Sequence, residues 1–292
     1  MTLRKRVAQV VKDLPPLSTV RRFWHESRFC AENAHGAFRG VYRSFAEARA
    51  AAPRGHNVGF DHHVFAGVYP DRLRRIFAYD YPVLFWLKPL LAGGPKIFDI
   101  GGHVGLHYYA FPPYLPDLPG ISWTVCDVPS VAQAGRRLAA DRGDAANMSF
   151  TSELRDVAGH DVVLASGSLQ YIESPSLAEL LGSLASRPRH LLLNKLPLHD
   201  RPTFVTLQNA KVTFTPCRML NRAEFLGSLA ALGYRVIDTW EVPERDHYIP
   251  MHPDRSFGAA SGMYLALGDE AGPSASSRLD FNRLTAFLDR TA

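Results

Sequence analysis

The stretch FDIGGHVG, residues 98–105, decides how the rest of the chain is interpreted. An apolar segment leads into Asp99, and three glycines follow where a helix is expected to begin: Gly101, Gly102 and Gly105. Glycine is needed where a chain turns sharply, or where its backbone must approach a ligand more closely than a Cβ allows. A strand, a glycine loop and a helix in this order predict a nucleotide-type binding loop.

From Pro95 onward, short apolar runs alternate with segments of helical pattern, which is typical of a parallel sheet with crossover helices. The sequence predicts seven strands, at Lys96–Ile100, Trp123–Asp127, Met148–Thr151, Asp161–Ala165, His190–Lys195, Tyr234–Trp240 and Met263–Leu267. A linker rich in proline and glycine joins the last two, so the last strand is expected to run antiparallel. The predicted fold is α/β, with a Rossmann-like seven-stranded sheet.

Three regions are expected along the chain. Residues 1–94 form an N-terminal helical segment that caps the substrate side, residues 95–268 form the binding domain, and residues 269–292 form a linker with a short C-terminal helix. Within the first region, Ser44 and Glu47 are spaced as a capping box that begins a helix. A second helical pattern runs from Pro70 to Leu91, and Pro82 is expected to break or bend it.

The positive charge of the chain is confined to its start. The formal net charge is +5, and residues 1–28 hold seven basic and two acidic side chains, so the remainder is formally neutral. This argues against a broad phosphate-binding face, and no nucleic-acid partner is expected. The amphipathic pattern within residues 1–28 predicts a helix that either docks on the domain or makes a peripheral contact with an anionic membrane.

Several features point to the cytoplasm. The longest apolar runs are far shorter than the ~20 residues of a membrane span, and the start lacks the apolar block of a secretory signal. Cys30, Cys126 and Cys217 lie far apart, so no disulfide framework or zinc cluster is expected. The predicted localisation is cytoplasmic, with peripheral attachment at the inner membrane face as an alternative.

Further ligand-binding residues are expected at the carboxyl ends of the strands. Asp127 ends the second predicted strand, where a carboxylate can accept both hydroxyls of a ribose. The fourth strand runs into Ser166, Gly167 and Ser168, whose small side chains leave space in the crevice. The predicted cofactor-binding residues are Asp99, Gly101, Gly102, His103, Gly105, Asp127, Val128, Ser152, Ser166, Gly167 and Ser168.

Three residues are candidates for catalysis. His107 lies one turn after His103, His199 follows the fifth strand, and Tyr171 follows the fourth. Histidine titrates near neutral pH and can act as a general base. His103 and His107 are also spaced as metal ligands, but no third ligand is positioned to complete a site, so no metal is predicted.

The connection at residues 199–218 is longer than usual and contains two β-like runs. It is expected to cover an acceptor pocket, where Gln208 and Asn209 would hydrogen-bond a polar acceptor. The alternative is a purely structural hairpin.

Seven segments carry a resemblance to a known family: GAFRGVYRSFAEARAAA, YDYPVLFWL, FDIGGHVGLHYYAF, WTVCDVP, LASGSLQYI, FVTLQN and CRMLNRAEFLGSLAALGYRVIDTW. They resemble class I methyltransferases that use S-adenosyl-L-methionine (SAM) and, more narrowly, a bacterial family of methyltransferases whose acceptor is not established. The match covers about residues 37 to 243. The resemblance implies a methyltransferase sheet, SAM as the cofactor, and methyl transfer to a small-molecule or sugar-containing acceptor.

One departure from the family concerns His103, since the general pattern of an acid followed by alternating glycines has a small residue there. Two alternatives to a SAM-dependent enzyme remain open, and the departure at His103 bears on the second of them. One is a nicotinamide-dependent oxidoreductase, although Asp127 follows Gly101 at a wider spacing than the ~20 residues of a dinucleotide fold. The other is a non-catalytic, methyltransferase-like binding protein. The oligomeric state has no signature in the sequence.

Overall fold

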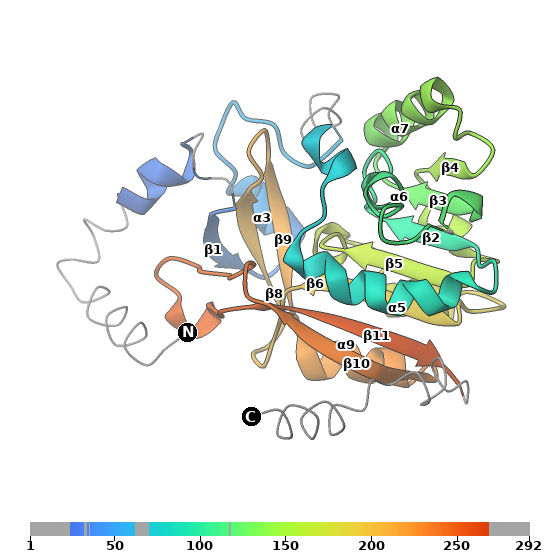
Figure 1. Cartoon of the computed structure of the whole chain (residues 1–292). Helices are drawn as coiled ribbons and strands as arrows, with labels where there is room; N and C mark the ends of the chain where they lie inside the picture. Colours follow the sequence, from blue (N-terminus) through green and yellow to red (C-terminus); the bar gives the residue numbers. More distant parts are fainter. Residues whose placement is uncertain (1–23, 32–33, 35, 62–69, 117, 269–292) are drawn as a thin grey trace, which may run out of the picture.

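A computed structural model describes residues 24–31, 34, 36–61, 70–116 and 118–268. The predictions for the basic start of the chain and for the C-terminal helix lie outside these residues. Two β-sheets with helices around them make up the described chain (Figure 1). Within the described residues, no helix is both long and apolar enough to cross a membrane.

The larger sheet confirms the predicted fold. Its strands are β2 (Ile97–Ile100), β3 (Trp123–Cys126), β4 (Met148–Thr151), β5 (Val162–Ser166), β6 (His190–Leu196), β10 (Tyr234–Val242) and β11 (Ala260–Leu267). Their order is β10-β11-β6-β5-β2-β3-β4. The neighbours from β6 to β4 pair in parallel, whereas β11 runs antiparallel to both β6 and β10. This is the predicted Rossmann-like seven-stranded sheet with an antiparallel last strand.

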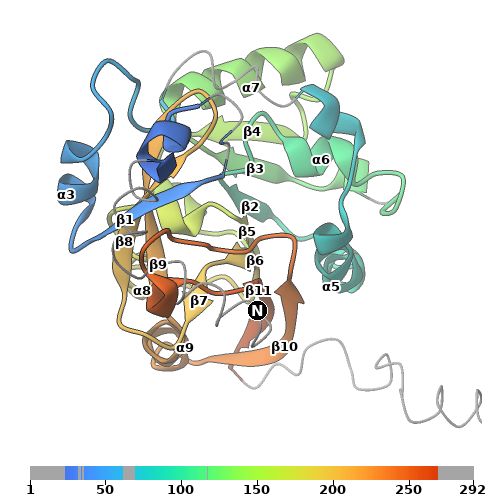
Figure 2. The same ribbon diagram turned by 90° about the vertical axis from the view of Figure 1, so that its left-hand side faces the viewer.

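Helices cover both faces of this sheet because successive strand residues point to opposite sides. Ile97 belongs to one buried cluster, with α5 (Tyr81–Leu91), α6 (Leu106–Ala110) and α7 (Pro129–Arg142). Phe98 belongs to the other, with α8 (Leu177–Gly182) and α9 (Arg222–Ala230). Figure 2 shows α5 and α6 on one side of the strands and α8 and α9 on the other. The alternation also directs Asp99 toward α6.

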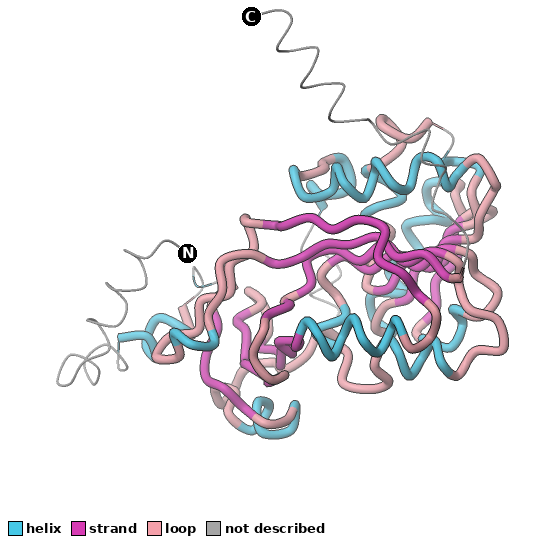
Figure 3. The backbone as a smooth tube through the Cα atoms, turned by 90° about the horizontal axis from the view of Figure 1, so that it is seen from below, coloured by secondary structure: helices cyan, strands magenta, loops and turns pink. Residues whose placement is uncertain are grey.

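The smaller sheet consists of β1 (Phe38–Tyr42), β8 (Phe204–Asn209), β9 (Phe214–Asn221) and β7 (Leu198–His199), in the order β1-β8-β9-β7. Strands β8 and β9 form the predicted hairpin, and α3 (Phe45–Ala50) contacts both of them. The sheet lies beside the larger one in two views (Figures 1 and 3). Strand β1 was not predicted, so the N-terminal segment contains a strand as well as helices.

The region from Pro70 to Leu91 differs from the predicted bent helix. It forms two short 3-10 helices, at Pro70–Arg74 and Ala78–Asp80, before α5 begins at Tyr81. Pro82 therefore lies in the first turn of α5, where the missing N–H has no helical partner to lose. The prediction of a break at Pro82 was wrong, because this proline begins the helix.

Candidate functional site

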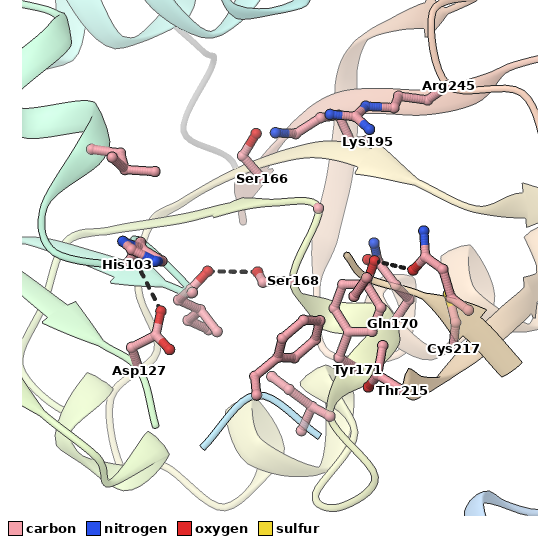
Figure 4. A pocket seen from close by; sticks show the side chains of 18 of the residues that line it. His103, Asp127, Ser166, Ser168, Gln170, Tyr171, Lys195, Thr215, Cys217 and Arg245 are labelled. Atoms are coloured by element: carbon pink, nitrogen blue, oxygen red, sulfur yellow. Dashed lines mark hydrogen bonds between the residues drawn. The ribbon is translucent and has the colours of Figure 1, made fainter. Parts of the chain in front are cut away.

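A cavity of about 880 Å³ opens at the carboxyl ends of the central strands, and the smaller sheet forms its opposite wall. This volume is in the upper part of the ~300–1,000 Å³ range of small-molecule sites. Ten of the predicted site residues line it: Gly101, His103, His107, Asp127, Val128, Ser152, Ser166, Gly167, Ser168 and Tyr171. Figure 4 shows part of this lining.

The glycines of the loop are required mainly by packing. A Cβ on Gly101 would lie 2.3 Å from Cβ of Ser168, and Gly101 has a positive φ of 72°. A Cβ on Gly102 would lie 2.3 Å from the Asp99 carboxylate, and Gly102 does not line the cavity. Gly105, at φ 95°, packs against Met148 and is also outside the lining. Gly102 and Gly105 therefore have a role in folding the loop, and neither lines the cavity.

Asp127 and His103 are joined through the backbone. The His103 N–H donates to Oδ2 of Asp127 over 2.9 Å (Figure 4), and the Val128 N–H donates to Oδ1 over 2.8 Å. Burial raises the pKa of Asp127 to about 6, against the lowering effect of these two hydrogen bonds. The His103 residue is 4% exposed and has a positive φ of 57°. Its side chain is thus part of the cavity wall.

Asp99 supports a histidine instead of lining the cavity. Its side chain is fully buried, and Oδ2 lies 2.9 Å from Nδ1 of His107 and 3.3 Å from the indole nitrogen of Trp123. A carboxylate at Nδ1 holds an imidazole with Nε2 as the acceptor nitrogen. His107 lines the cavity and is therefore an oriented candidate base.

His199, in contrast, does not line the cavity, so the structure does not bring it together with the other predicted site residues. It lies in β7, is 7% exposed, and its ring stacks on Phe257 at 5.4 Å between centroids. Its Nδ1 accepts the Arg201 N–H over 3.0 Å. The fifth strand continues through Leu196, and His199 belongs to the smaller sheet that follows.

Of the two amide side chains predicted to face the cavity from the β8–β9 hairpin, only that of Gln208 lines it. Tyr171 donates its hydroxyl to Oε1 of Gln208 over 2.6 Å, and both residues line the cavity. Gln170 also lines it, and its buried Oε1 has no hydrogen-bond partner among the described residues. Asn209 instead donates to the carbonyl of Phe29 over 2.7 Å, so its role is structural.

The sequence analysis missed a group of cationic side chains at one end of the cavity. Arg72, Arg75, Lys195 and Arg245 lie over the faces of Phe77 and Tyr79, and all six residues line the cavity. We call these six residues the cation end, and Gly101, His103, Asp127 and Ser168 the glycine-loop end. Lys195 ends a predicted strand, and this position was the only signal in the sequence. Its side chain lies along Gly167, whose added Cβ would be 3.1 Å from Cε of the lysine.

The fold and the glycine-loop end define a Rossmann-like α/β architecture with a ligand cavity at the carboxyl ends of its strands. Comparison with protein-family models and with curated proteins gives no match. Solved structures similar to the chain include the mitomycin 7-O-methyltransferase MmcR, at 19% identity and a TM-score of 0.40, covering 64% of this chain and 54% of that one. Another is the O-methyltransferase NcsB1 from neocarzinostatin biosynthesis, in complex with S-adenosyl-L-homocysteine (SAH) and 1,4-dihydroxy-2-naphthoic acid. It has 17% identity and a TM-score of 0.39, and the match covers 65% of this chain and 57% of that one.

A third similar structure is the 1,6-didemethyltoxoflavin-N1-methyltransferase of Burkholderia thailandensis, at 18% identity and a TM-score of 0.43. The match covers 72% of this chain and 84% of that chain. The present chain matches a little over half the length of MmcR and NcsB1. The functional assignment therefore depends on the residues of the cavity.

Proposed function

We propose that the protein is a SAM-dependent methyltransferase of the bacterial family that its motifs resemble, acting on a small-molecule or sugar-containing acceptor. One observation carries this proposal. The glycine loop after β2 and Asp127 after β3 lie at the carboxyl ends of adjacent strands and line the same cavity. Open α/β sheets bind their ligands at this edge. The cavity is also large enough for a donor and a second small molecule.

The residues of the glycine-loop end suit the donor. Each carboxylate oxygen of Asp127 accepts one backbone N–H, and a carboxylate has about four acceptor sites, so capacity remains for ribose hydroxyls. The His103 side chain is packed into the wall, which leaves the cavity open beside Gly101. Asp127 would hold the ribose, and Gly101 with residues 166–168 would lie beside the methionine portion. SAM supplies the methyl group, and alignment of donor and acceptor provides much of the acceleration.

The test is direct binding to the full-length protein. We expect SAH to bind one site per chain in calorimetry, and S-adenosyl compounds to be found by mass spectrometry in the supernatant of the denatured protein. A parallel titration uses NADH. Binding of NADH without SAH would replace the proposal with an oxidoreductase, and binding of neither would leave a non-catalytic protein.

We further propose that His107 is the general base when the acceptor loses a proton. Its Nδ1 is held by Asp99, and its imidazole lines the cavity. The acceptor can be found by transfer of a labelled methyl group from SAM to fractions of a metabolite extract. With that acceptor, His107→Gln is expected to lower kcat by ~10²–10⁴-fold, since a glutamine amide cannot take the proton.

His199→Gln provides the matched control, because His199 does not line the cavity. It is expected to keep the wild-type kcat in protein whose fold is verified by circular dichroism. A kcat in His107→Gln within threefold of the wild-type value would remove His107 as the base.

A further inference from the structure

Three of the four cationic side chains at the cation end make no ion pair with a described carboxylate. No salt bridge joins Arg75, Lys195 or Arg245 to a carboxylate in the part of the chain that the structure describes. Asp80 is buried nearby, where its Oδ2 accepts the Phe77 N–H over 2.9 Å. Glu244 and Asp246 also line the cavity, and both are exposed, as are Arg75 and Arg245. The less exposed charged residues of this end are Arg72 and Lys195 against Asp80, so positive charge predominates there.

Lys195 lies at the centre of this arrangement. Its Nζ is 4.8 Å from the centroid of the Tyr79 ring, and Arg72 donates to the hydroxyl of the same tyrosine over 2.6 Å. Burial lowers the pKa of Lys195 to about 7, and the neighbouring guanidinium groups of Arg72 and Arg245 act in the same direction, against Asp80 and Asp99. An ammonium held between two guanidinium groups is unfavourable unless an anion offsets the repulsion.

The backbone at Lys195 is also in an unfavourable conformation. Its φ is 55°, in the left-handed region that favours glycine. Strain of this kind persists only where the surrounding structure imposes it, and it is concentrated at functional sites. A lysine held in this conformation directs its side chain along Gly167 and into the cavity.

The cation end adjoins the contacts predicted for the donor at Gly167, along which the Lys195 side chain lies, and its charged groups extend away from the glycine-loop end (Figure 4). Figure 4 shows Lys195 and Arg245 beside each other, on the opposite side of the view from His103 and Asp127. The stacked rings of Phe77 and Tyr79, 5.2 Å apart, form an apolar base under the charges. This combination suits an organic molecule that carries an anionic group on an apolar body.

We propose that the cation end binds a carboxylate or phosphate group of the methyl acceptor, which makes the acceptor a small anionic molecule. This inference rests on the proposed function only in identifying the bound anion as the methyl acceptor. Binding of the anion itself follows from Lys195, Arg245 and the aromatic base. Guanidinium groups pair with either anion through parallel hydrogen bonds.

The test titrates the full-length protein with benzoate, phenyl phosphate and the neutral analogue benzyl alcohol, at constant ionic strength, with and without SAH. We expect at least one anionic probe to bind tenfold or more tightly than benzyl alcohol. Comparison of the two anions identifies the preferred group. Lys195→Met and Arg245→Gln are each expected to weaken its binding tenfold or more, with SAH affinity within threefold of wild type.

Arg137→Gln is the matched control, since Arg137 is exposed on α7, outside the cavity lining, and its loss removes the same charge. Equal anion binding in Arg245→Gln, Lys195→Met and Arg137→Gln would overturn the proposal. A tenfold loss of SAH affinity in the cation-end variants would also overturn it, because the cluster would then hold the carboxylate of the donor. Failure of wild-type protein to bind SAH counts against the proposed function, whereas the anion titration without SAH still decides this inference.

Discussion

The two ends of the cavity are built in different ways. At the glycine-loop end, the polar groups bond to one another through the backbone, as in the contacts of Asp127 with the His103 and Val128 N–H groups. At the cation end, side chains from three separate segments bring like charges together around two aromatic rings. The first end is held by its own hydrogen bonds, whereas at the second end the proposed anion would offset the repulsion between like charges. This difference suggests that the cation end determines which acceptor is used.

The largest effect is expected where backbone packing forms the glycine-loop end. Gly101→Ala places a Cβ 2.3 Å from Ser168 at a positive φ, which should lower the free energy of unfolding by ~2–4 kcal/mol. Gly55→Ala is the control, because Gly55 has a similar φ of 79° but nothing within 4 Å of the added Cβ. Urea unfolding of both variants measures the difference. Equal losses would show that contact with Ser168 does not constrain the loop.

The next effect concerns the carboxylate of that end. Asp127→Ala is expected to weaken SAH binding by ~1–3 kcal/mol, the cost of leaving polar partners unpaired in a buried site. The control is Asp141→Ala, an exposed residue of α7. Calorimetry that gives the same SAH affinity in wild type and Asp127→Ala would exclude Asp127 from the donor site.

The same carboxylate predicts a pH dependence. Burial raises the pKa of Asp127 to about 6, and ribose hydroxyls that donate to it favour its ionised form. SAH affinity should therefore be full above pH 6 and fall below it, by up to about tenfold per pH unit. Titrations from pH 8 to pH 5 measure this, and Asp127→Asn should remove the decrease. An SAH affinity that stays constant down to pH 5 would exclude Asp127 as the titrating group.

A smaller effect, of opposite sign, is expected at the cation end. Lys195→Met should raise the free energy of unfolding by ~1 kcal/mol at pH 6, since it removes a desolvated charge crowded by two guanidinium groups. The pKa of Lys195 is lowered to about 7, so the gain is full below pH 7 and shrinks as the pH rises toward the ordinary value for lysine. Lys88→Met, at an exposed position, is the control and should change stability by less than ~0.5 kcal/mol. A loss of stability in Lys195→Met would mean that groups of the protein already offset the charge of Lys195.

The smallest effect is expected at His103. Its contact with Asp127 uses the backbone N–H, which glycine retains, and its positive φ suits glycine. His103→Gly should therefore change SAH affinity by less than about tenfold, or ~1.4 kcal/mol. Absence of SAH binding in wild type with binding restored in His103→Gly would show that the histidine blocks the site.

The sequence predicted the parts of the site that are contiguous in the chain. The larger sheet and the loop from Asp99 to Gly105 follow from local patterns of apolar residues and glycines, and all seven predicted strands are present. The cation end could not be predicted, because Arg72, Lys195 and Arg245 come together only through tertiary packing. His199 shows the converse. Its position after a predicted strand favoured a place near the cavity, but in the structure it belongs to β7, which pairs with β9 in the smaller sheet.

The pairing of β1 with β8 has a consequence for how the protein folds. Phe38 lies opposite Gln208, and Tyr42 lies opposite Val205, so the smaller sheet closes a loop of most of the described chain. Contacts between residues so distant in sequence form slowly, because the entropy of closing the loop must be overcome first. The larger sheet can begin to form during translation, because β2, β3 and β4 are close together in the sequence and pair with one another. The cavity, in contrast, gains its second wall only once β8 and β9 have been synthesised, so a nascent chain cannot bind an acceptor before its final strands are being made.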